Sequence, residues 1–385
     1  MNFYEDSVRD VIVVGAGPSG SYMGYSLSKM GHDVLILEEH REVGKPVECT
    51  GLVSERVMKL VNTKAETNYV TGASIIFPGR SSIHIEKTEK TIVMDRDHFD
   101  KDVAGMAIGA GSDFSINSRV ISVKEHEDHV SVKYRKDGRI VEENASVVVG
   151  ADGINSVVRK ELYGTRPSRI VSAYQVDSAY SMEDQRSVEV YLGSGTSGGF
   201  FGWATPSGDL TKIGTGSLFP TARKFFERLN RNFGSNRILG INGGAIPISY
   251  LKRTYSNRSI LVGDAAGIVK PLSGGGIYTG IVSSKCGAGV ISRAIENGSV
   301  NSKSLSLYQK SWRSELGKEL WFDGIIQKLF SSLSDRTFDR LYRVISRPEI
   351  TELINRKGDI DYPSKVVLSV ILRSPEILAY LLAGK

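Results

Sequence analysis

The chain has 385 residues, of which 40% are hydrophobic and 24% charged, an ordinary composition for a folded protein that excludes a disordered or fibrous one. Its length allows two or three domains of roughly 100–200 residues each. The formal net charge is +6, and residues 301–385 carry 14 basic and 10 acidic side chains, so +4 of the excess lies in this last stretch. Such a bias suits an anionic membrane surface or an ordinary solvated helix face, and it is too small to indicate nucleic-acid binding.

Cys49 and Cys286 are the only cysteines, too few to hold an iron–sulfur cluster or a structural zinc within the chain or to form a disulfide scaffold. We therefore expect a cytoplasmic protein, and the first residues lack the apolar region of a signal peptide. No apolar run reaches the ~18 residues that a membrane-spanning helix needs. The histidines have no metal-ligand spacing, so no metal is expected.

The first predicted unit is a strand, a glycine-rich turn, a helix and a second strand. The first strand covers residues 10–14, the helix 21–30 and the second strand 33–37, which ends at Glu38. Between the first strand and the helix lies the sequence Gly15-Ala16-Gly17-Pro18-Ser19-Gly20. This order of elements is typical of a dinucleotide-binding fold.

Each glycine of this turn has a different expected structural role. Gly15 permits the tight turn, Gly17 lets a pyrophosphate approach the backbone, and Gly20 lets the helix pack closely on the strand. The helix N-terminus presents N–H groups and a partial positive charge to the phosphates. Glu38 can accept hydrogen bonds from both ribose hydroxyls. The segment therefore predicts dinucleotide binding.

The remaining elements alternate between strand-rich and helical stretches. We expect short strands at 69–92, a helix at 95–110, strands at 120–149 with a hairpin turn at 136–139, an antiparallel sheet at 169–218, a buried strand at 259–262, and helices after 301. Because strands of the nucleotide-binding type lie on both sides of the region 169–218, the nucleotide-binding domain is predicted to be discontinuous.

Two later motifs identify the dinucleotide. One is Val147–Arg159, which contains Asp152; the other is Ile260–Gly267, which ends a strand at Asp264 and precedes Gly274-Gly275-Gly276-Ile277. With the first glycine-rich turn and these two motifs in this order, the chain resembles the FAD-dependent superfamily of aromatic hydroxylases and their relatives. The resemblance implies that FAD is the cofactor.

The same resemblance implies roles for individual residues. Asp264 would hold the ribityl chain, and the amides of Gly275 and Gly276 would face the flavin pyrimidine carbonyl, where negative charge builds on reduction. Arg96 matches an Arg-x-x-Phe-Asp helix start and would lie near FAD, although a surface ion pair would also explain it. The full set of expected FAD-binding residues is Gly15, Ala16, Gly17, Gly20, Glu38, Cys49, Thr50, Arg96, Val120, Asp152, Asp264, Gly275, Gly276 and Ile277.

The expected fold class is α/β, or α+β for the chain as a whole. A Rossmann-like FAD-binding domain is predicted from residues 1–68, 92–165 and 255–300. An antiparallel-sheet substrate domain is predicted from residues 69–91 and 166–254, followed by a C-terminal helical region at 301–385.

The segment Lys45–Leu52 helps to distinguish between the families of this superfamily. A disulfide reductase would need a second cysteine five residues after Cys49, but position 54 is Ser54, so dithiol chemistry through this segment is excluded. The segment resembles that of the archaeal and plant geranylgeranyl reductase family, from whose usual Cys-Gly-Glu-Gly pattern Thr50 departs. Cys49 is predicted to be catalytic, and a small buried hydrophobic residue is an equally good interpretation.

The segment Gly198–Pro206 is similar to an aromatic-x-Trp-x-x-Pro motif of the same family. Phe201 and Trp203, two residues apart on one strand, would point to the same face and line an apolar tunnel for a polyprenyl chain, and we expect both to be catalytic. Ordinary sheet packing is the alternative. The side chains that could extend this wall are Tyr174, Tyr191 and Phe219.

The resemblance implies an FAD-dependent reductase of archaeal membrane lipid synthesis. Reduced flavin would deliver hydride to isolated double bonds of a geranylgeranyl chain, and digeranylgeranylglycerophospholipid is the expected substrate. The electron donor would be ferredoxin, a deazaflavin or NADPH, and Cys49, a bound water and the flavin itself are all open as proton donors. The C-terminal helices would close the tunnel and rest on the membrane, or serve only in core packing.

Two other functions fit the same motifs. An aromatic monooxygenase of this fold would use NAD(P)H and oxygen, although no second dinucleotide fingerprint for NAD(P)H is present. A non-redox lipid-binding protein would keep FAD as a structural group and would leave the mass of its lipid unchanged.

Overall fold

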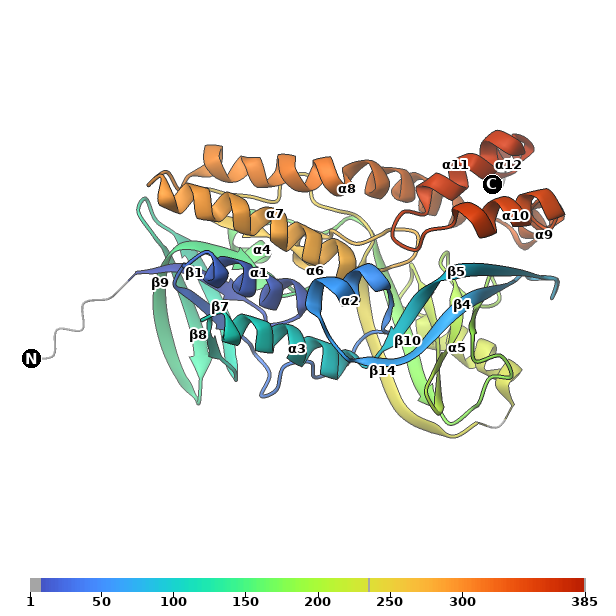
Figure 1. Cartoon of the computed structure of the whole chain (residues 1–385), viewed down its shortest axis with the longest axis horizontal. Helices are drawn as coiled ribbons and strands as arrows, with labels where there is room; N and C mark the ends of the chain where they lie inside the picture. The colour runs from blue at the N-terminus through green and yellow to red at the C-terminus, as the bar shows by residue number, and fades with distance from the viewer. Residues whose placement is uncertain (1–7, 235, 384–385) are drawn as a thin grey trace, which may run out of the picture.

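A computed structural model gives the fold of residues 8–234 and 236–383 as two sheets, a layer of long helices and a cluster of short C-terminal helices (Figure 1). This arrangement confirms the predicted mixed α/β fold class with its C-terminal helical region. None of the described helices is long and apolar enough to cross a membrane.

The first sheet has seven strands around a parallel core. Its strands are β1 (Arg9–Val14), β2 (Val34–Leu37), β6 (Asp113–Ser115), β7 (Ser118–Glu125), β8 (Val130–Lys136), β9 (Arg139–Gly150) and β15 (Ser259–Leu261). β1 lies between β2 and β9 and pairs with both in parallel, whereas β7, β8 and β9 pair antiparallel. The last four residues of β1 are buried, as expected of a strand that is covered on both faces.

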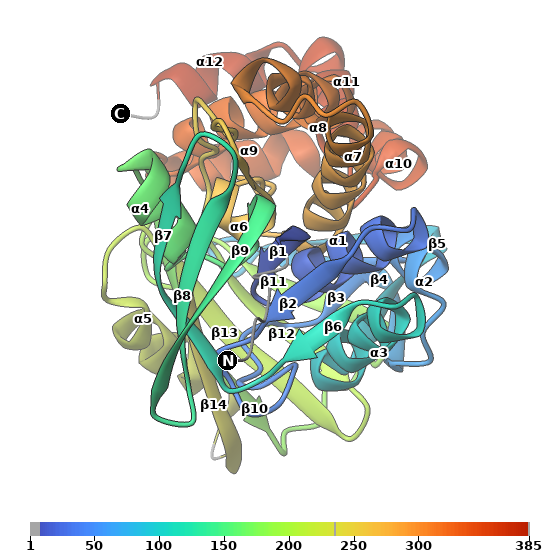
Figure 2. The ribbon, with the colours of Figure 1, turned by 90° about the vertical axis from the view of Figure 1, so that its left-hand side faces the viewer.

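Long helices cover this sheet. α1 (Pro18–Lys29) packs between α3 (Arg96–Gly109) and α7 (Ile277–Glu296), and α8 (Ser302–Phe330) lies on the outer side of α7 (Figures 1 and 2). α1 begins at Pro18, three residues before the predicted start, because proline is well suited to the first helical position. The short helix α2 (Glu55–Val61) contacts α3 and α7, α4 (Val157–Tyr163) packs on β7 and β9, and α6 (Gly263–Ala266) contacts α7.

The second sheet has eight strands and is antiparallel except where β11 pairs with β4. Its strands are β3 (Leu52–Ser54), β4 (Glu66–Ile76), β5 (Ser82–Met94), β10 (Ile170–Ser178), β11 (Ser187–Tyr191), β12 (Gly202–Ser207), β13 (Leu210–Ser217) and β14 (Ile238–Pro247). The predicted short strands at 69–92 are two long ones, β4 and β5. The sheet also includes β3, from a segment that we assigned to the FAD-binding domain; the domain boundaries stay a prediction.

The two faces of the second sheet have different environments. α5 (Ala222–Leu229) and the 3₁₀ turn η1 (Asn230–Phe233) cover one face through a core that includes Val176, Ala204 and Ile213. Side chains alternate between the faces of a strand, so the neighbours Gln175, Trp203 and Lys212 lie on the opposite face.

The C-terminal helices form a separate apolar cluster beside β5. They are α9 (Asp335–Ile345), α10 (Pro348–Lys357), α11 (Ser364–Arg373) and α12 (Glu376–Ala383). Their core includes Phe338, Leu341 and Ile350, which pack with Ile83 of β5 and with Phe77 of the turn before it. The cluster therefore joins the end of α8 to the second sheet.

Trp312 is one of the α8 side chains that attach this helix to the core of the first sheet. Its side chain is fully buried, packs against Tyr250 and donates a hydrogen bond from Nε1 to Oγ1 of Thr254 at 3.0 Å. We expect Trp312→Ala to lower the free energy of unfolding by about 3–5 kcal/mol, because it leaves a large cavity and removes a buried hydrogen bond. Urea unfolding measures the change.

Leu307→Ala on the same helix is the matched control. Leu307 is 47% exposed, so its truncation should change the free energy of unfolding by no more than about 0.5 kcal/mol. Equal losses in the two variants would contradict the placement of α8.

Candidate cofactor and substrate site

The glycine-rich turn after β1 combines tight packing with one open position. The φ angle of Gly15 is +97°, and a Cβ atom on this residue would lie 2.5 Å from the carbonyl oxygen of Ala151. A Cβ atom on Gly20 would overlap the carbonyl oxygen of Gly15, but one on Gly17 would meet no atom within 4 Å. Packing therefore requires the first and third glycines, and the second leaves space at the N-terminus of α1 that fits a diphosphate.

Glu38 lies beside this turn at the end of β2. One carboxylate oxygen accepts a hydrogen bond from the N–H of Ala16 at 2.8 Å, and the other accepts one from the N–H of His40 at 2.9 Å. The N–H of Ser118 donates to the carbonyl of Glu38 at 2.7 Å, which places the start of β7, with Val120, next to it. The Val120 side chain is buried in the sheet core, so a contact with adenosine would use its backbone.

Asp152 has a structural partner in this fold. Its Oδ2 accepts hydrogen bonds from the N–H groups of Val157 and Val158 at 2.6 and 3.3 Å, so the carboxylate caps α4. Its Oδ1 is buried and has no hydrogen-bond partner among residues 8–234 and 236–383. Burial raises the pKa of Asp152, and the hydrogen bond from Ser156 opposes this. One oxygen thus remains for the predicted cofactor contact.

Arg96 forms a buried ion pair rather than a surface one. Its Nε and Nη2 donate to the two carboxylate oxygens of Asp100 at 3.1 and 2.9 Å. Burial alone would lower the pKa of Arg96, but Asp100 and the side chain of Cys49 outweigh burial and raise it above its usual value. The guanidinium is therefore a fixed positive charge next to Cys49.

Asp264 and the glycines that follow it form the opposite side of the site. A Cβ atom on Gly276 would lie 2.8 Å from Oδ1 of Asp264, so the carboxylate packs directly on the start of α7. Burial raises the pKa of Asp264 to about 6, and the charge of Arg96 opposes the shift. Gly276 is the N-cap residue of α7 and provides no side-chain cap, so Gly276 and Ile277 leave backbone N–H groups for an acceptor, whereas the N–H of Gly275 donates a long hydrogen bond to Oγ of Ser273 at 3.4 Å.

Gln175 connects the Cys49 segment to the aromatic strand. Its Oε1 accepts hydrogen bonds from Oγ1 of Thr50 at 2.6 Å and from Nε1 of Trp203 at 2.9 Å. Nζ of Lys212 donates to the carbonyl of Thr50 at 2.9 Å, and burial lowers the pKa of this lysine. Sγ of Cys49 accepts a hydrogen bond from the N–H of Gly51 at 3.3 Å.

The sequence analysis missed both Gln175 and Lys212. The sequence does contain a signal for them, since each is a long polar side chain on a strand that is otherwise apolar or glycine-rich. Both lie on the face of the sheet that carries Trp203. Neither is part of a local motif, because their partner Thr50 is 125 and 162 residues away in the sequence. Only the register of the second sheet shows that they meet.

Phe201 and Trp203 are neighbours, as expected. Their ring centroids are 5.9 Å apart, and Phe200 stacks on Phe201 at 4.3 Å. The ring of Trp203 lies against Gly214, where a Cβ atom would overlap it.

The proposed extension of this aromatic wall is wrong. Tyr174 packs against Phe226 and Tyr191 against Phe233, so both tyrosines belong to the opposite, α5-covered face of the sheet. Phe219 is 62% exposed. The sequence alone does not predict which face of the sheet these tyrosines occupy, because that depends on the strand register.

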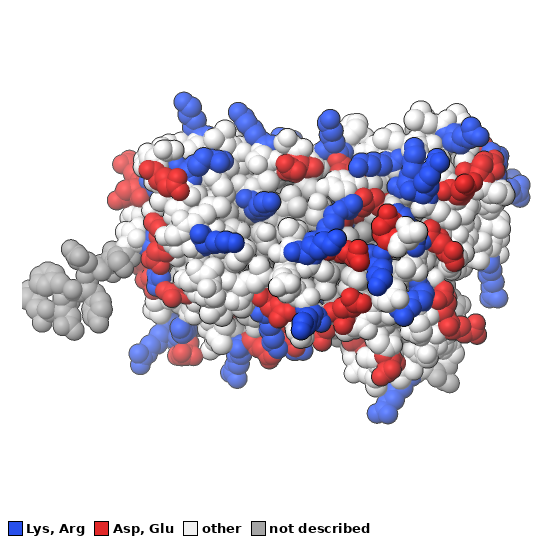
Figure 3. Space-filling model, viewed as in Figure 1, with Lys and Arg blue, Asp and Glu red and all other residues white. Residues whose placement is uncertain are grey.

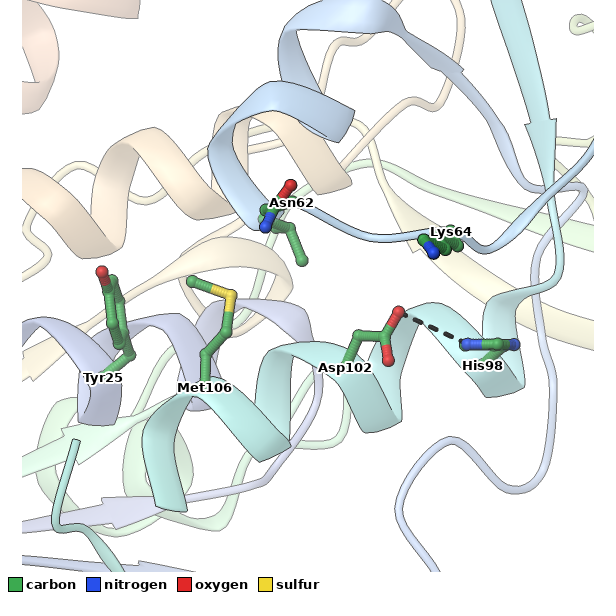
Figure 4. A pocket seen from close by; sticks show the side chains of 7 residues that line it. Tyr25, Asn62, Lys64, His98, Asp102 and Met106 are labelled. Carbon is green, nitrogen blue, oxygen red and sulfur yellow. Dashed lines mark ion pairs between the residues drawn. The ribbon is translucent and has the colours of Figure 1, made fainter. Parts of the chain in front are cut away.

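A surface hollow of about 530 Å³ lies away from these residues, between α1, α2 and α3 (Figure 4). His98 and Asp102 form an ion pair in it, with Nε2 and Oδ2 at 3.5 Å. Its lining residues are Tyr25, Val61, Asn62, Lys64, His98, Asp102 and Met106. None of the predicted FAD-binding residues lines this hollow, so we do not assign the cofactor to it.

Comparison with known proteins identifies the cofactor. A family model described as FAD binding domain matches residues 9–285. An uncharacterized protein of Methanocaldococcus jannaschii is 31% identical over 94% of both chains. A digeranylgeranylglycerophospholipid reductase of Methanococcoides burtonii is 31% identical over 86% of both chains.

The fold also matches a solved structure along its whole length. A geranylgeranyl bacteriochlorophyll reductase-like protein from Thermoplasma acidophilum superposes with a TM-score of 0.88 and 26% identity, over 98% of this chain and 99% of that one. The predicted FAD cofactor is thereby confirmed, whereas the individual contacts given above stay predictions.

Gly17 provides a direct test of the phosphate position. Its backbone is extended, with φ −65° and ψ 179°, and a Cβ atom there meets no protein atom within 4 Å, so Gly17→Ala should not harm the fold. The methyl group would occupy the space left for the diphosphate, and we expect the Kd for FAD to rise at least about tenfold, or ~1.4 kcal/mol. Fluorescence titration of the apoprotein with FAD measures this.

Gly105→Ala in α3 is the control. A Cβ atom on Gly105 also meets nothing within 4 Å, and the residue is exposed on a helix far from the turn. This variant should bind FAD as the parent protein does. An unchanged Kd in Gly17→Ala would refute the assignment of the open position to the diphosphate.

Proposed function

Because the chain belongs to the FAD-binding domain family and, within it, to the geranylgeranyl reductase family, we propose that it saturates isolated double bonds of geranylgeranyl chains. The proposed substrate is digeranylgeranylglycerophospholipid, which relatives about 30% identical are named for. Electrons would come from a separate donor such as ferredoxin, a deazaflavin or NADPH.

The link between Trp203 and the Cys49 segment supports this function most directly. Through Gln175, the aromatic side chains of the second sheet are held against Thr50, one residue from Cys49 and its neighbour Arg96. The apolar wall and the predicted cofactor site therefore share a boundary. A polyprenyl chain on this wall would bring its double bonds to the cofactor.

The protein's own residues would contribute binding and charge stabilisation. Bound FAD in its reduced form supplies the hydride. Burial of the prenyl chain against the partly exposed Phe201 and Trp203 would give ~0.8 kcal/mol for each CH₂-sized group, which favours bringing one bond after another into place. The ring of Trp203 would stabilise positive charge on the prenyl carbon by ~1–2 kcal/mol. Arg96 and the N-terminus of α7 favour negative charge on the cofactor.

An anaerobic turnover experiment tests the proposal. The FAD-loaded protein is reduced with dithionite, excess dithionite is removed, and a digeranylgeranyl lipid is added. We expect the lipid to gain two hydrogens for each flavin that returns to its oxidised spectrum, as measured by mass spectrometry and absorbance. Trp203→Leu should slow this step about 5- to 30-fold with FAD still bound, because a cation–π contribution of ~1–2 kcal/mol is lost.

Two outcomes would contradict the function. An unchanged lipid mass beside a flavin that stays reduced would exclude this substrate. Oxidation of NADPH that requires oxygen and an aromatic compound would indicate a monooxygenase instead. Phe219→Leu, at an exposed aromatic position of the same domain, should keep the parent rate.

We also propose that the C-terminal helices rest on an anionic lipid surface. Large apolar side chains are exposed on α8, α11 and α12, namely Trp321, Ile325, Leu368, Leu372, Leu378 and Leu382. Figure 3 shows several Lys and Arg side chains gathered over these helices, and exposed basic side chains there include Lys328, Lys365 and Arg373. Apolar side chains beside basic ones suit the interface of an anionic bilayer.

Vesicle co-sedimentation tests this contact. The parent protein should sediment with vesicles of mixed phosphatidylcholine and phosphatidylglycerol, and more weakly with phosphatidylcholine alone. The double variant Trp321→Ser, Leu372→Ser should lose most of the binding, whereas Ile140→Ser, at a 64% exposed residue of β9, should keep it. Equal binding of both variants would refute the assigned surface.

A further inference from the structure

α8 carries a row of polar side chains on its buried side. Glu319, Asp323 and Gln327 are four residues apart and are therefore stacked on one face of the helix. Their exposed fractions are 8%, 1% and 0%. Three adjacent buried polar side chains in a helix that otherwise buries apolar residues need a reason, because an unpaired buried polar group costs free energy.

Only part of this row is satisfied. Glu319 accepts hydrogen bonds from the N–H and the hydroxyl of Ser364, and Nε2 of Gln327 donates to the carbonyl of Gly199 at 3.1 Å. Both carboxylate oxygens of Asp323 and Oε1 of Gln327 have no partner among the described residues. Three oxygens within about one helical turn thus lack partners from residues 8–234 and 236–383, and water molecules, which both donate and accept hydrogen bonds, are of the required size.

The row lies over the loop that leads to α7. A Cβ atom on Gly275 would lie 2.7 Å from Cε of Lys270, whose Nζ pairs with Asp361 at 3.1 Å. Pro271 approaches the Cβ position of Gly324, the residue after Asp323, at 4.0 Å. The row is therefore adjacent to the loop whose amides are predicted to face the flavin.

The same row also reaches the aromatic segment. Gln327 is hydrogen-bonded to Gly199, and the next residue, Phe200, stacks on Phe201. A Cβ atom on Gly274 would be 3.4 Å from the ring of Phe200, so the glycine-rich loop and the aromatic segment meet at this point. Asp323 and Gln327 thus lie behind the junction of the two parts of the proposed active site.

We propose that Asp323, with Gln327, forms a buried relay that supplies the proton for double-bond reduction. The inference rests on the proposed function, since saturation of a double bond requires one proton for each hydride. The O–H bond of the Asp323 carboxyl breaks, its proton passes through water held by the unpaired acceptors, and a C–H bond forms at the carbon that does not receive hydride. Solvent then returns a proton to the carboxylate, and the reduced cofactor supplies both electrons.

The electrostatic surroundings keep this carboxyl protonated. Burial, and to a smaller extent the negative charge of Glu319, raise the pKa of Asp323 to about 7 against the opposing charge of Lys270. The charge of Lys270 is balanced by Asp361, which also pairs with Arg56 of α2 at 3.2 Å. Near neutral pH the group can therefore both release and regain a proton.

The experiment compares Asp323→Asn, which keeps the shape, with Asp323→Glu, which keeps the carboxyl. Single-turnover lipid reduction by the dithionite-reduced holoenzyme is followed between pH 5.5 and 8.5. In the parent protein the rate should decline above about pH 7. Asp323→Asn should reduce the lipid at least about tenfold more slowly at pH 6, and its rate should not decline above pH 7. Asp323→Glu should recover part of the rate and part of the decline with pH.

The pH dependence of Tm shows, without any activity assay, whether the Asp323 carboxyl holds a proton in the folded protein. The folded protein holds the Asp323 proton up to about pH 7, whereas the unfolded chain releases it near pH 4, so this group makes unfolding easier as the pH rises between the two values. Asp323→Asn should therefore gain in Tm relative to the parent protein from pH 5 to pH 8. Glu315→Gln, at an exposed carboxylate of α8, should show no such trend.

The possible failures can be told apart. If the parent protein reduces no lipid at any pH, the proposed function fails. If it does, and Asp323→Asn keeps the parent rate and pH profile, the relay is refuted. If Asp323→Asn reduces the lipid at least as fast as Asp323→Glu, the rate depends on the shape of the side chain and not on its carboxyl group, and the relay is refuted as well.

Discussion

The buried guanidinium of Arg96 is the charge around which the site is organised. A cation inside a protein is tolerated only with an opposite charge close by, and Asp100 supplies it through two hydrogen bonds. The side chain of Cys49 and the carboxylate of Asp264 lie within the electrostatic field of the same cation. Segments far apart in the sequence thus meet at a single charge, which the FAD-binding fold places at the boundary of its two sheets.

The second constraint is the hydrogen bonding of Gln175. One carbonyl oxygen accepts from both Thr50 and Trp203, so the Cys49 segment and the aromatic strand cannot move independently without leaving a donor unpaired. Lys212 strengthens the same contact by donating to the backbone of Thr50. The polar link therefore attaches the aromatic strand of the second sheet to the segment that is predicted to contact the cofactor.

The sequence predicted best the features that are determined locally. The turn from Gly15 to Gly20 lies within one strand–turn–helix unit, and the packing of its glycines is the same wherever that unit occurs. The helix at 95–110 was equally recognisable, since Asp95 caps its start. The domain boundaries and the individual FAD contacts stay predictions.

Features that depend on register or on distant partners were not predictable. Tyr174 and Gln175 are adjacent in β10, yet Tyr174 packs under α5, whereas Gln175 accepts hydrogen bonds from Thr50 and Trp203 on the opposite face. Their alternation follows from strand geometry, but which face meets the cofactor follows from the pairing of β10 with β13. Asp323 was hidden for a similar reason, because its burial results from the packing of α8 on a loop about 50 residues earlier.

Reduction of an isolated double bond requires two opposite environments in one place. The prenyl chain and the developing positive charge require an apolar, aromatic wall from which water is excluded, whereas the second hydrogen must arrive as a proton. A solvent-filled channel would provide the proton but would also weaken every electrostatic contact in the site. The proposed carboxyl of Asp323, buried behind the junction of Gly274 and Phe200, would meet both requirements, since it would carry a proton without opening the wall to bulk water. On this view, α8 not only supports the fold but separates the proton path from the lipid path.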